Sequence, residues 1–251
     1  MFLAIDVGNT QTVLGLYQAA ELKFTARITT VSTDTADELN VRLQGLFSLN
    51  GIGFADVNDV AIASVVPPLT EQWRIAAATL TGKQPYILNS ESVTGLAILY
   101  HDPAEIGADR LADAVAAIHL YGAPVIVVDF GTATNIEVIN KDGAFVGGII
   151  APGLVTSAEA LFSAAARLAK VDIEIPDKVV GISTKTAIQS GLTYGEIDRI
   201  DGLIHRVFDE LGYTAPVVAT GGLSHRVVNL SRTITDINDD LTLHGLHILF
   251  G

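Results

Sequence analysis

Short apolar segments separated by glycine-rich turns dominate the start of the chain and predict β-strands. Residues 1–7 have the pattern of a buried strand, residues 8–11 that of a turn, and residues 12–17 and 22–28 those of two further strands. Because strands this close in sequence pair most simply with their neighbours, the region is predicted to form an antiparallel meander.

Helices and strands alternate after the meander. Residues 34–49 carry apolar side chains at helical spacing behind a cluster of Ser, Thr and Asp suited to N-capping, which predicts a helix. Residues 59–64 predict a strand that stops before two prolines, a second helix follows through Leu80, and residues 86–88 predict a short strand. This mixture is typical of an α/β protein.

The second part of the chain begins the same plan again. Residues 108–120 predict a helix, residues 125–129 a strand, and residues 132–139 and 144–150 a pair of hairpin strands. A further apolar strand is predicted at residues 216–220, followed by a Gly-Gly turn and a helix.

Two segments of the chain resemble each other. Residues 2–17 and 125–139 both consist of an apolar strand, a terminal aspartate, a turn containing glycine and threonine, and a second strand. Their aspartates, Asp6 and Asp129, lie about half the chain apart, which is the spacing that duplication of one domain would produce. Buried strands also commonly end in Asp-x-Gly turns, so the pattern alone leaves coincidence open.

Composition limits the class of protein. The 251 residues suffice for one large domain or two small ones. Hydrophobic residues make up 49% of the chain, yet the apolar stretches are shorter than the ~18 to 20 residues of a spanning helix. The first residues lack the basic start of a signal peptide, and no cysteine is present. We therefore expect a cytoplasmic protein without a membrane partner.

The charge of the chain disfavours one class of partner. A formal net charge of -13 argues against nucleic-acid binding, which relies on lysine and arginine to neutralise phosphates. An acidic protein can still bind an anion locally, provided that magnesium, backbone amides or a few cations offset the charge.

The two related turns are candidate phosphate sites. Gly8 and Gly131 leave backbone amides uncovered, while Thr10, Thr132 and Thr134 add hydroxyl donors. An aspartate beside such a turn suits Mg²⁺, which takes a few carboxylates together with water and substrate phosphates. The alternative is a purely structural Asx turn. The candidates at the first turn are Asp6, Asn9 and Thr10.

Two glycine pairs add weaker signals. Gly147-Gly148 precedes the segment IIAPG, and Gly221-Gly222 follows the predicted strand 216–220 directly. A strand, a Gly-Gly turn and a helix N-terminus let a nucleotide approach the backbone closely, although most such pairs are simple turns.

Asp109 and Arg110 stand together at the start of the predicted helix 108–120. They offer a proton acceptor and an anion-binding cation at a helix N-terminus, where negative charge is stabilised. From this segment alone, a capping aspartate beside a surface arginine explains the pair equally well.

Several familiar nucleotide-binding signatures are absent from the sequence. Nothing matches G-x-x-x-x-G-K-[ST] or G-x-G-x-x-G. Residues Asp129-Phe130-Gly131 spell the protein-kinase triplet, but the H-R-D loop and the lysine-bearing strand are missing, so that match is accidental.

Five motifs in order resemble those of the type III pantothenate kinases. They are DVGNT at 6–10, GADR at 107–110, DFGTAT at 129–134, GGIIAPG at 147–153 and ATGGL at 219–223. The resemblance runs over nearly the whole chain and implies an α/β fold with two similar ribonuclease-H-like halves, each a mixed β-sheet with flanking helices, as in the acetate and sugar kinase, heat-shock chaperone and actin superfamily. The implied halves are residues 1–106 and 107–251.

The resemblance implies that the chain is an enzyme that uses ATP to phosphorylate the hydroxyl of pantothenate, the first step of coenzyme A biosynthesis. It also implies Mg²⁺, a potassium or ammonium ion, and a homodimer with pantothenate at its interface. Asp109 would be the catalytic proton acceptor. The residues implied to hold nucleotide phosphates and magnesium, together with the Gly-Gly pair, are Asp6, Val7, Gly8, Asn9, Thr10, Gln11, Thr12, Val13, Thr132, Gly221 and Gly222. The residues implied to contact pantothenate are Tyr100, Gly107, Ala108, Asp109, Arg110 and Thr184, with Asp6 and Asp129 as metal ligands.

The chain departs from the family pattern at three places. Asp113 stands where relatives usually have asparagine, Asn135 where they often have threonine, and GIST at 181–184 where they commonly have GKNT. Asp113 adds negative charge one helical turn beyond Asp109, where it would raise the pKa of the base or repel an anionic substrate. Two alternatives to pantothenate phosphorylation remain: another small-molecule kinase of the superfamily, and a non-catalytic accessory factor.

Overall fold

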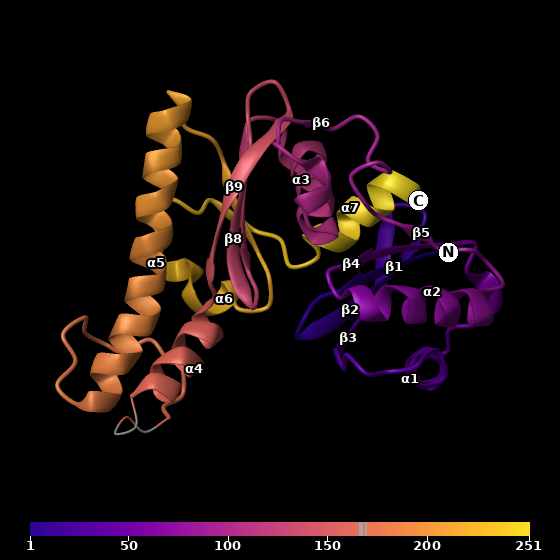
Figure 1. Cartoon of the computed structure of the whole chain (residues 1–251), viewed down its shortest axis with the longest axis horizontal. Helices are drawn as coiled ribbons and strands as arrows, with labels where there is room; N and C mark the ends of the chain where they lie inside the picture. Colours follow the sequence, from indigo (N-terminus) through magenta and orange to yellow (C-terminus); the bar gives the residue numbers. More distant parts are fainter. Residues whose placement is uncertain (166–167, 169) are drawn as a thin grey trace. The chain divides into compact units, whose positions relative to one another are not determined.

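The computed structural model describes residues 1–165, 168 and 170–251 of the chain (Figure 1). The chain forms two compact units. The first comprises Met1–Leu120 together with Asp240–Gly251, and the second comprises Tyr121–Asp239. The sequence predicts two duplicated halves, residues 1–106 and 107–251. Those halves are defined by the internal repeat and not by compactness, so this division stays a prediction.

The first unit contains a sheet in the order β3-β2-β1-β4-β5. Its strands are β1 (Phe2–Val7), β2 (Gln11–Gln18), β3 (Glu21–Thr29), β4 (Asp59–Ser64) and β5 (Tyr86–Ile87). Strands β1, β2 and β3 pair antiparallel, as the predicted meander requires, whereas β4 pairs parallel to both β1 and β5. A short strand, β6 (Ala97–Ile98), follows in the chain.

Helices cover both faces of this sheet. The helices that pack on it are α1 (Ala36–Leu49), α2 (Pro67–Thr81) and α7 (Leu241–Phe250). The chain also forms α3 (Ala108–Tyr121) and the short 3₁₀ turns η1 (Phe54–Asp56) and η2 (Pro103–Glu105). Helix α1 begins with a capping box between Thr35 and Glu38, which satisfies two backbone donors at its start. The side chains of α1 and α2, including Phe47 and Trp73, pack with alternate residues of β1, β2 and β4.

The second unit repeats the strand order of the first. Its strands are β7 (Val125–Phe130), β8 (Ala133–Ile139), β9 (Ala144–Pro152), β10 (Val217–Thr220) and β11 (Asp236–Ile237). Strands β7, β8 and β9 form an antiparallel meander, while β10 pairs parallel to β7 and to β11. Both sheets therefore place a meander on one side of their first strand and parallel strands on the other, as a duplicated domain would.

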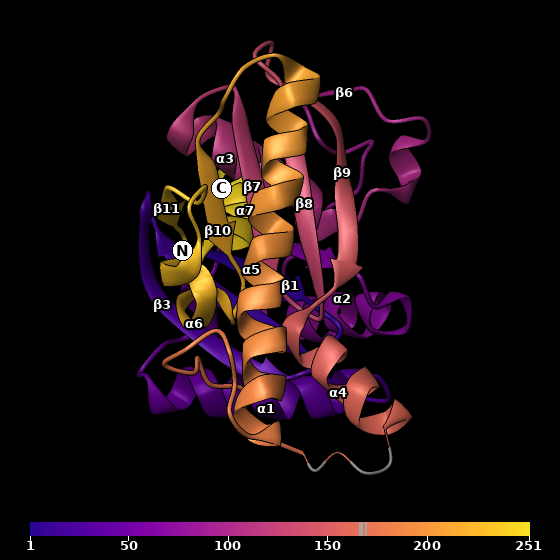
Figure 2. The same cartoon turned by 90° about the vertical axis from the view of Figure 1, so that its left-hand side faces the viewer.

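Helix α5 (Thr184–Leu211) is the longest element of the second unit and was not among the predicted elements. Its apolar residues pack against β7, β8 and β10, so the helix runs along one face of the sheet (Figure 2). Three glycines on its exposed surface, Gly191, Gly195 and Gly202, dilute the apolar periodicity that would have marked it as a helix. The remaining helical segments are α4 (Leu154–Ala164), α6 (Ser224–Val227) and η3 (Val228–Leu230).

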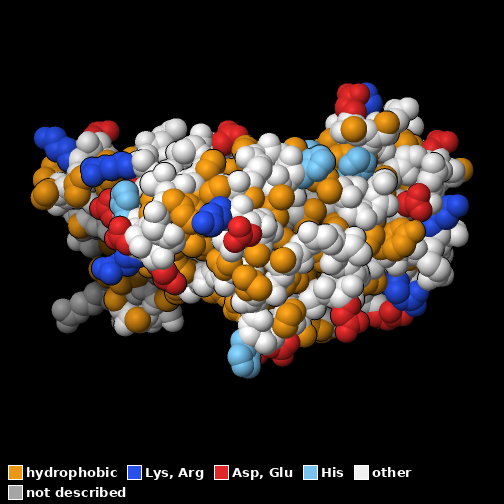
Figure 3. All heavy atoms as spheres, turned by 90° about the horizontal axis from the view of Figure 1, so that it is seen from above, with side chains coloured by type: hydrophobic (Ala, Val, Ile, Leu, Met, Phe, Trp, Pro, Cys, Tyr) orange, Lys and Arg blue, Asp and Glu red, His pale blue; other side chains and the backbone are white. Residues whose placement is uncertain are grey.

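The surface carries charged side chains of both signs. Figure 3 shows Lys and Arg interspersed with acidic and apolar side chains on the face it displays, without a continuous basic patch among the described residues there. Within the described part of the chain, no helix has both the length and the apolar character needed to cross a membrane.

Helix α7, at the end of the chain, belongs to the first unit and packs closely on α3. A Cβ atom added to Gly245 would overlap the backbone carbonyl of Ala112. Beside this contact, the Thr242 hydroxyl donates a hydrogen bond of 2.7 Å to the buried carboxylate of Asp113. On the sheet side, Leu243 fills the space next to Gly15 of β2, where an added Cβ would lie 2.8 Å from its Cδ1 atom.

Gly245→Ala is expected to destabilise the first unit. Because the added methyl group would meet backbone rather than a movable side chain, we expect a loss of roughly 1–3 kcal/mol, the usual cost of overpacking. Gly202→Ala in α5 is the matched control, since nothing lies within 4 Å of its added Cβ. Alanine there is expected to stabilise the helix by about 0.5–1 kcal/mol. Denaturant unfolding of both variants measures the difference, and equal stability of the two would contradict the close packing of α7 on α3.

Candidate active site

The first predicted phosphate turn joins β1 to β2. Asp6 pairs with Val13 of β2 and with Ala63 of β4, which places its carboxylate near the end of the parallel pair. The Gly8 amide donates to the Gln11 carbonyl at 3.1 Å and closes the turn. Asn9, Thr10 and Gln11 are exposed at its tip.

The buried members of the same segment support the turn. Val7 and Thr12 are almost completely buried, and the Thr12 hydroxyl lies 2.9 Å from the Thr30 hydroxyl of the neighbouring chain segment. Their side chains therefore hold the turn in place, and the exposed tip residues and backbone are what a phosphate could reach.

The segment that carries Asp109 lies next to the end of β4. The Val65 amide continues the parallel ladder by donating to the Val7 carbonyl at 3.0 Å. A Cβ atom added to Gly107 would lie 3.3 Å from the Val65 side chain and 2.5 Å from Oδ1 of Asp109. Gly107 thus allows a close approach, and the first unit brings the start of α3 near the strand ends that hold the first turn.

Asp109 is desolvated at the start of α3. Its Oδ1 accepts a hydrogen bond of 2.8 Å from the Arg110 amide. Burial raises the pKa of the Asp109 carboxyl, while the Arg110 amide and the Arg110 charge oppose the rise. Desolvation is therefore the main cause of the raised pKa, rather than the expected effect of Asp113, whose carboxylate instead accepts the Thr242 hydrogen bond.

Two residues that are predicted to contact pantothenate lie in or near this segment. Arg110 is buried, with 6% of its surface exposed, and Tyr100 is half-buried in the stretch between β6 and η2. Ala108 is the first residue of α3 and is also buried. The described contacts place Arg110 inside the protein rather than on its surface, in contrast to a simple surface arginine.

The second unit gathers the other predicted residues around Asp129. Asp129 pairs with Asn135 of β8 and with Thr220 of β10. Gly221 has a backbone φ of 87°, and a Cβ atom there would overlap Oδ1 of Asp129. A Cβ atom on Gly131 would lie 3.5 Å from Oδ2. Two glycine turns therefore lie closely beside one carboxylate.

The turn that carries Thr132 is fastened to the start of α4. The Thr132 carbonyl accepts hydrogen bonds from the Gly153 amide at 3.1 Å and from the Thr156 hydroxyl at 2.6 Å. A Cβ atom on Gly153 would collide with the backbone of Gly131 and Thr132. Thr132 itself is exposed at the surface of the turn. Sequence reasoning missed Thr156, for which no sequence signal was available beyond its place in the first turn of a helix.

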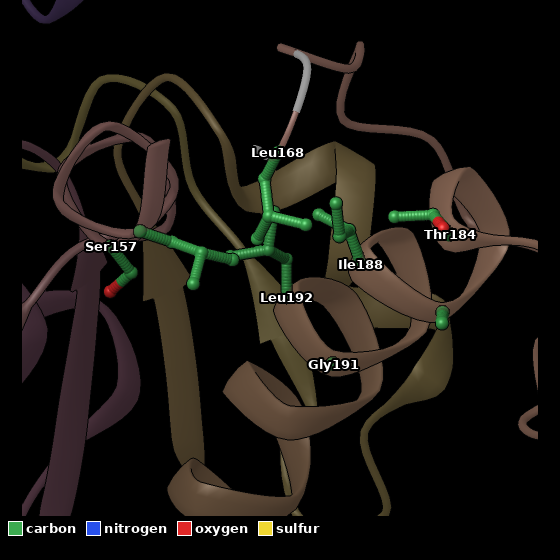
Figure 4. A pocket seen from close by; sticks show the side chains of 8 residues that line it. Ser157, Leu168, Thr184, Ile188, Gly191 and Leu192 are labelled. Carbon is green, nitrogen blue, oxygen red and sulfur yellow. The ribbon is translucent and has the colours of Figure 1, made fainter. Parts of the chain in front are cut away.

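Thr184 begins α5 beside a cavity of the second unit. This cavity holds about 520 Å³ between α4 and α5 (Figure 4). Its lining residues are Ser157, Leu161, Leu168, Thr184, Ala187, Ile188, Gly191 and Leu192. Ser183, part of the unusual GIST segment, caps α5 through a capping box with Thr186. Asparagine, the usual family residue at this position, is an equally good N-cap, so capping does not explain the departure.

The described residues contain no cluster of three or more His, Cys, Asp or Glu side chains that could enclose a metal ion. A single carboxylate such as Asp6 with hydroxyl and backbone oxygens nearby still suits Mg²⁺, which keeps water and substrate phosphates as ligands. The donor chemistry at the first turn therefore fits magnesium bound together with a nucleotide.

Comparison with solved structures supports the fold. A protein from Campylobacter jejuni described as a Baf family transcriptional activator aligns with a TM-score of 0.62 at 17% identity, covering 98% of this chain and 96% of that one. A protein from Listeria monocytogenes described as an N-acetylmannosamine kinase aligns with a TM-score of 0.54 at 12% identity, covering 99% and 97%. Together with the two flanked sheets, these likenesses confirm the predicted fold class.

Comparison of sequences goes further than the fold. The sequence model of a family described as type III pantothenate kinase matches residues 2–206. A type III pantothenate kinase from Syntrophotalea carbinolica is 44% identical over 250 residues, which covers 100% of this chain and 98% of the relative. Identity at this level over the full length, with the five motifs in order, means that the chain belongs to the type III pantothenate kinase family.

Proposed function

We propose that this protein transfers the γ-phosphoryl group of ATP to the primary hydroxyl of pantothenate, and thereby begins coenzyme A biosynthesis. The observation that carries the proposal is the family membership over the whole chain, since the full-length relative is named for this activity. The desolvated Asp109 beside Gly107 and Arg110 supports it, because these residues form the motif that the family resemblance assigns to substrate binding.

Phosphoryl transfer needs positioning, charge neutralisation and a proton acceptor, with little covalent work from the protein. In this proposal the turn at Asp6 to Val13 and the turn at Thr132 hold the phosphates through backbone amides and hydroxyls. Gly221 and Gly222 let the nucleotide approach the backbone. Magnesium, held by Asp6 and the phosphates, neutralises negative charge when it is bound.

Asp109 acts as the general base in the proposed reaction. One of its carboxylate oxygens takes the proton from the pantothenate hydroxyl as the hydroxyl oxygen attacks the γ-phosphorus, and the bond from that phosphorus to the β–γ bridging oxygen breaks to release ADP. A carboxylate with a raised pKa is the better proton acceptor, so desolvation at the start of α3 improves it for this step. Tyr100, Gly107, Ala108, Arg110 and Thr184 contact pantothenate, with Arg110 opposite its carboxylate.

The remaining parts of the proposal follow the family resemblance. The protein works in the cytoplasm as a homodimer, with pantothenate bound at the interface of two copies. Asp129 holds a potassium or ammonium ion, and the position of its carboxylate beside the two glycine turns supports this assignment.

An ADP-release assay with a substrate panel tests the function directly. Purified protein with Mg-ATP is expected to release ADP with pantothenate and not with acetate, N-acetylmannosamine or other sugars. Turnover of a sugar without turnover of pantothenate would favour another small-molecule kinase. Absence of turnover with every substrate would favour a non-catalytic accessory factor.

Asp109→Asn is expected to lower kcat by about 10²- to 10⁴-fold, the range of a general base. Asparagine keeps the oxygen that accepts from the Arg110 amide, so nucleotide binding should survive. Since burial raises the pKa of Asp109, the folded state binds the carboxyl proton more tightly than the unfolded state does. The carboxyl therefore stabilises the fold most below its unfolded pKa, and that contribution disappears as pH rises through the folded pKa.

At neutral pH the neutral asparagine should accordingly leave stability unchanged or increase it. Wild-type kcat should fall as pH falls through the raised pKa, because protonation removes the base. Steady-state kinetics against pH and thermal unfolding measure both effects. Retention of more than about a third of wild-type kcat by the variant would assign Asp109 to helix capping instead.

Activity is expected to depend on a monovalent cation at Asp129. Potassium or ammonium buffers should support turnover, whereas buffers with sodium as the only monovalent cation should lose most of it. Asp129→Asn should remove the difference between the buffers, because the carboxylate that holds the ion is gone. Equal wild-type rates in sodium and potassium would refute a cation requirement.

A further inference from the structure

Helix α5 carries a carboxylate in the middle of its buried apolar stripe. Ile188, Leu192, Ile200 and Ile204 follow one another at intervals of four or eight residues and pack into the core of the second unit. Glu196 occupies the fourth-residue position between Leu192 and Ile200, and only 4% of its surface is exposed. An apolar residue would continue the stripe, whereas a charged side chain is rarely buried unless it has partners.

Both oxygens of Glu196 have specific partners. The Thr134 hydroxyl donates to Oε1 at 2.6 Å, and the Arg199 guanidinium, one turn further along α5, lies 2.5 Å from Oε2. The same Nη2 atom of Arg199 also donates to the Pro152 carbonyl at 2.9 Å. One helix therefore contacts the start of β8 and the end of β9 through a single charge-assisted network.

These contacts lead to the two ends of the Thr132 turn. Thr134 follows Thr132 by two residues, on the face of β8 that also presents Ile136 and Val138 to the core. On the other side, Pro152 immediately precedes Gly153, whose amide donates to the Thr132 carbonyl. The network thus reaches the turn from both neighbouring segments, and Thr132 itself remains exposed.

Stability alone is a poor explanation for this arrangement. Glu196 is buried but 32% of the Arg199 side chain is exposed, and an ion pair with a solvent-accessible partner contributes little to stability. The network is instead suited to holding one backbone geometry, since Thr134, Glu196 and Nη2 of Arg199 make directional contacts, while the Nε atom of Arg199 is buried without a hydrogen-bond partner among the described residues.

We propose that Glu196 and Arg199 are positioning residues that hold the Thr132 turn in the geometry that binds the phosphates of ATP. The inference rests on the proposed function in one respect, that Thr132 contacts the nucleotide. Glu196 acts through Thr134, and Arg199 acts through Pro152. Neither residue touches the substrate.

The same helix supplies a matched control. Asp201, five residues beyond Glu196, accepts a hydrogen bond of 2.6 Å from the Thr233 hydroxyl and one of 2.7 Å from the Ser231 hydroxyl. Two residues beyond Thr233, the Thr235 hydroxyl donates a hydrogen bond to the Val217 carbonyl at the start of β10. Gly221 follows the opposite end of that strand. Thr134 and Thr233 therefore donate equally short hydrogen bonds to buried carboxylates of α5, but only Thr134 adjoins the phosphate turn.

The decisive experiment compares Thr134→Val with Thr233→Val in the full chain. Calorimetric titration with Mg-ATP, without pantothenate, gives the nucleotide Kd, and thermal unfolding gives the stability. Thr134→Val is expected to weaken ATP binding about tenfold, the equivalent of one charge-assisted hydrogen bond. Thr233→Val should change Kd by less than about twofold while losing comparable stability.

Two further variants separate positioning from folding. Thr134→Ser keeps the hydroxyl and should bind ATP as the wild type does. Glu196→Leu completes the apolar stripe and should keep the protein folded but weaken ATP binding as Thr134→Val does. In steady-state kinetics the variants should raise KM for ATP and leave KM for pantothenate within about twofold.

Equal loss of ATP affinity in Thr134→Val and Thr233→Val would overturn the proposal, as would unchanged affinity in Thr134→Val. If the wild-type protein binds Mg-ATP but does not phosphorylate pantothenate, only the proposed reaction is refuted. The comparison of Kd values then still decides the role of Glu196. A wild-type protein that binds no nucleotide would overturn both.

Discussion

Parallel backbone pairing beside the first strand of each unit determines where the candidate site residues lie. In the first unit β1 pairs with β4, so Asp6 stands opposite Ala63. In the second unit β7 pairs with β10, so Asp129 stands opposite Thr220. Because parallel strands end at the same edge of a sheet, the turns that follow them emerge together, and ligands of open α/β sheets bind at such edges.

Glycine makes the close approaches at these edges possible. Gly107 lies against Val65 and Asp109, Gly153 against the Thr132 turn, and Gly221 against Asp129. At each of these positions a side chain would occupy space that already holds backbone or a carboxylate oxygen. The glycine-rich motifs therefore have a packing role as well as the role of leaving backbone amides open to an anion.

Buried carboxylates in this protein fall into two physical classes. Asp109 has its pKa raised mainly by desolvation, as a group kept for proton transfer would. At Asp201 burial also acts to raise the pKa, but hydrogen bonds from Ser231, Thr233 and the backbone of Arg232 and Thr233 outweigh it and lower the pKa. Glu196 resembles Asp201 in having a partner for each oxygen. The difference sets Asp109, the proposed base, apart from carboxylates whose oxygens are engaged by hydrogen-bond donors.

The sequence by itself determined the strands of both meanders, helices α1 to α3, the repeated strand-Asp-turn plan and the five motifs, because these depend on local periodicity and turn chemistry. Only the tertiary structure decided that α7 packs with the first unit, that Asp113 bonds to Thr242, and that Glu196 reaches Thr134. It also revealed α5, whose glycines obscure its pattern. The three contacts join residues far apart in the chain. Their energies come from burial and from directional hydrogen bonds between packed elements, which no local pattern records.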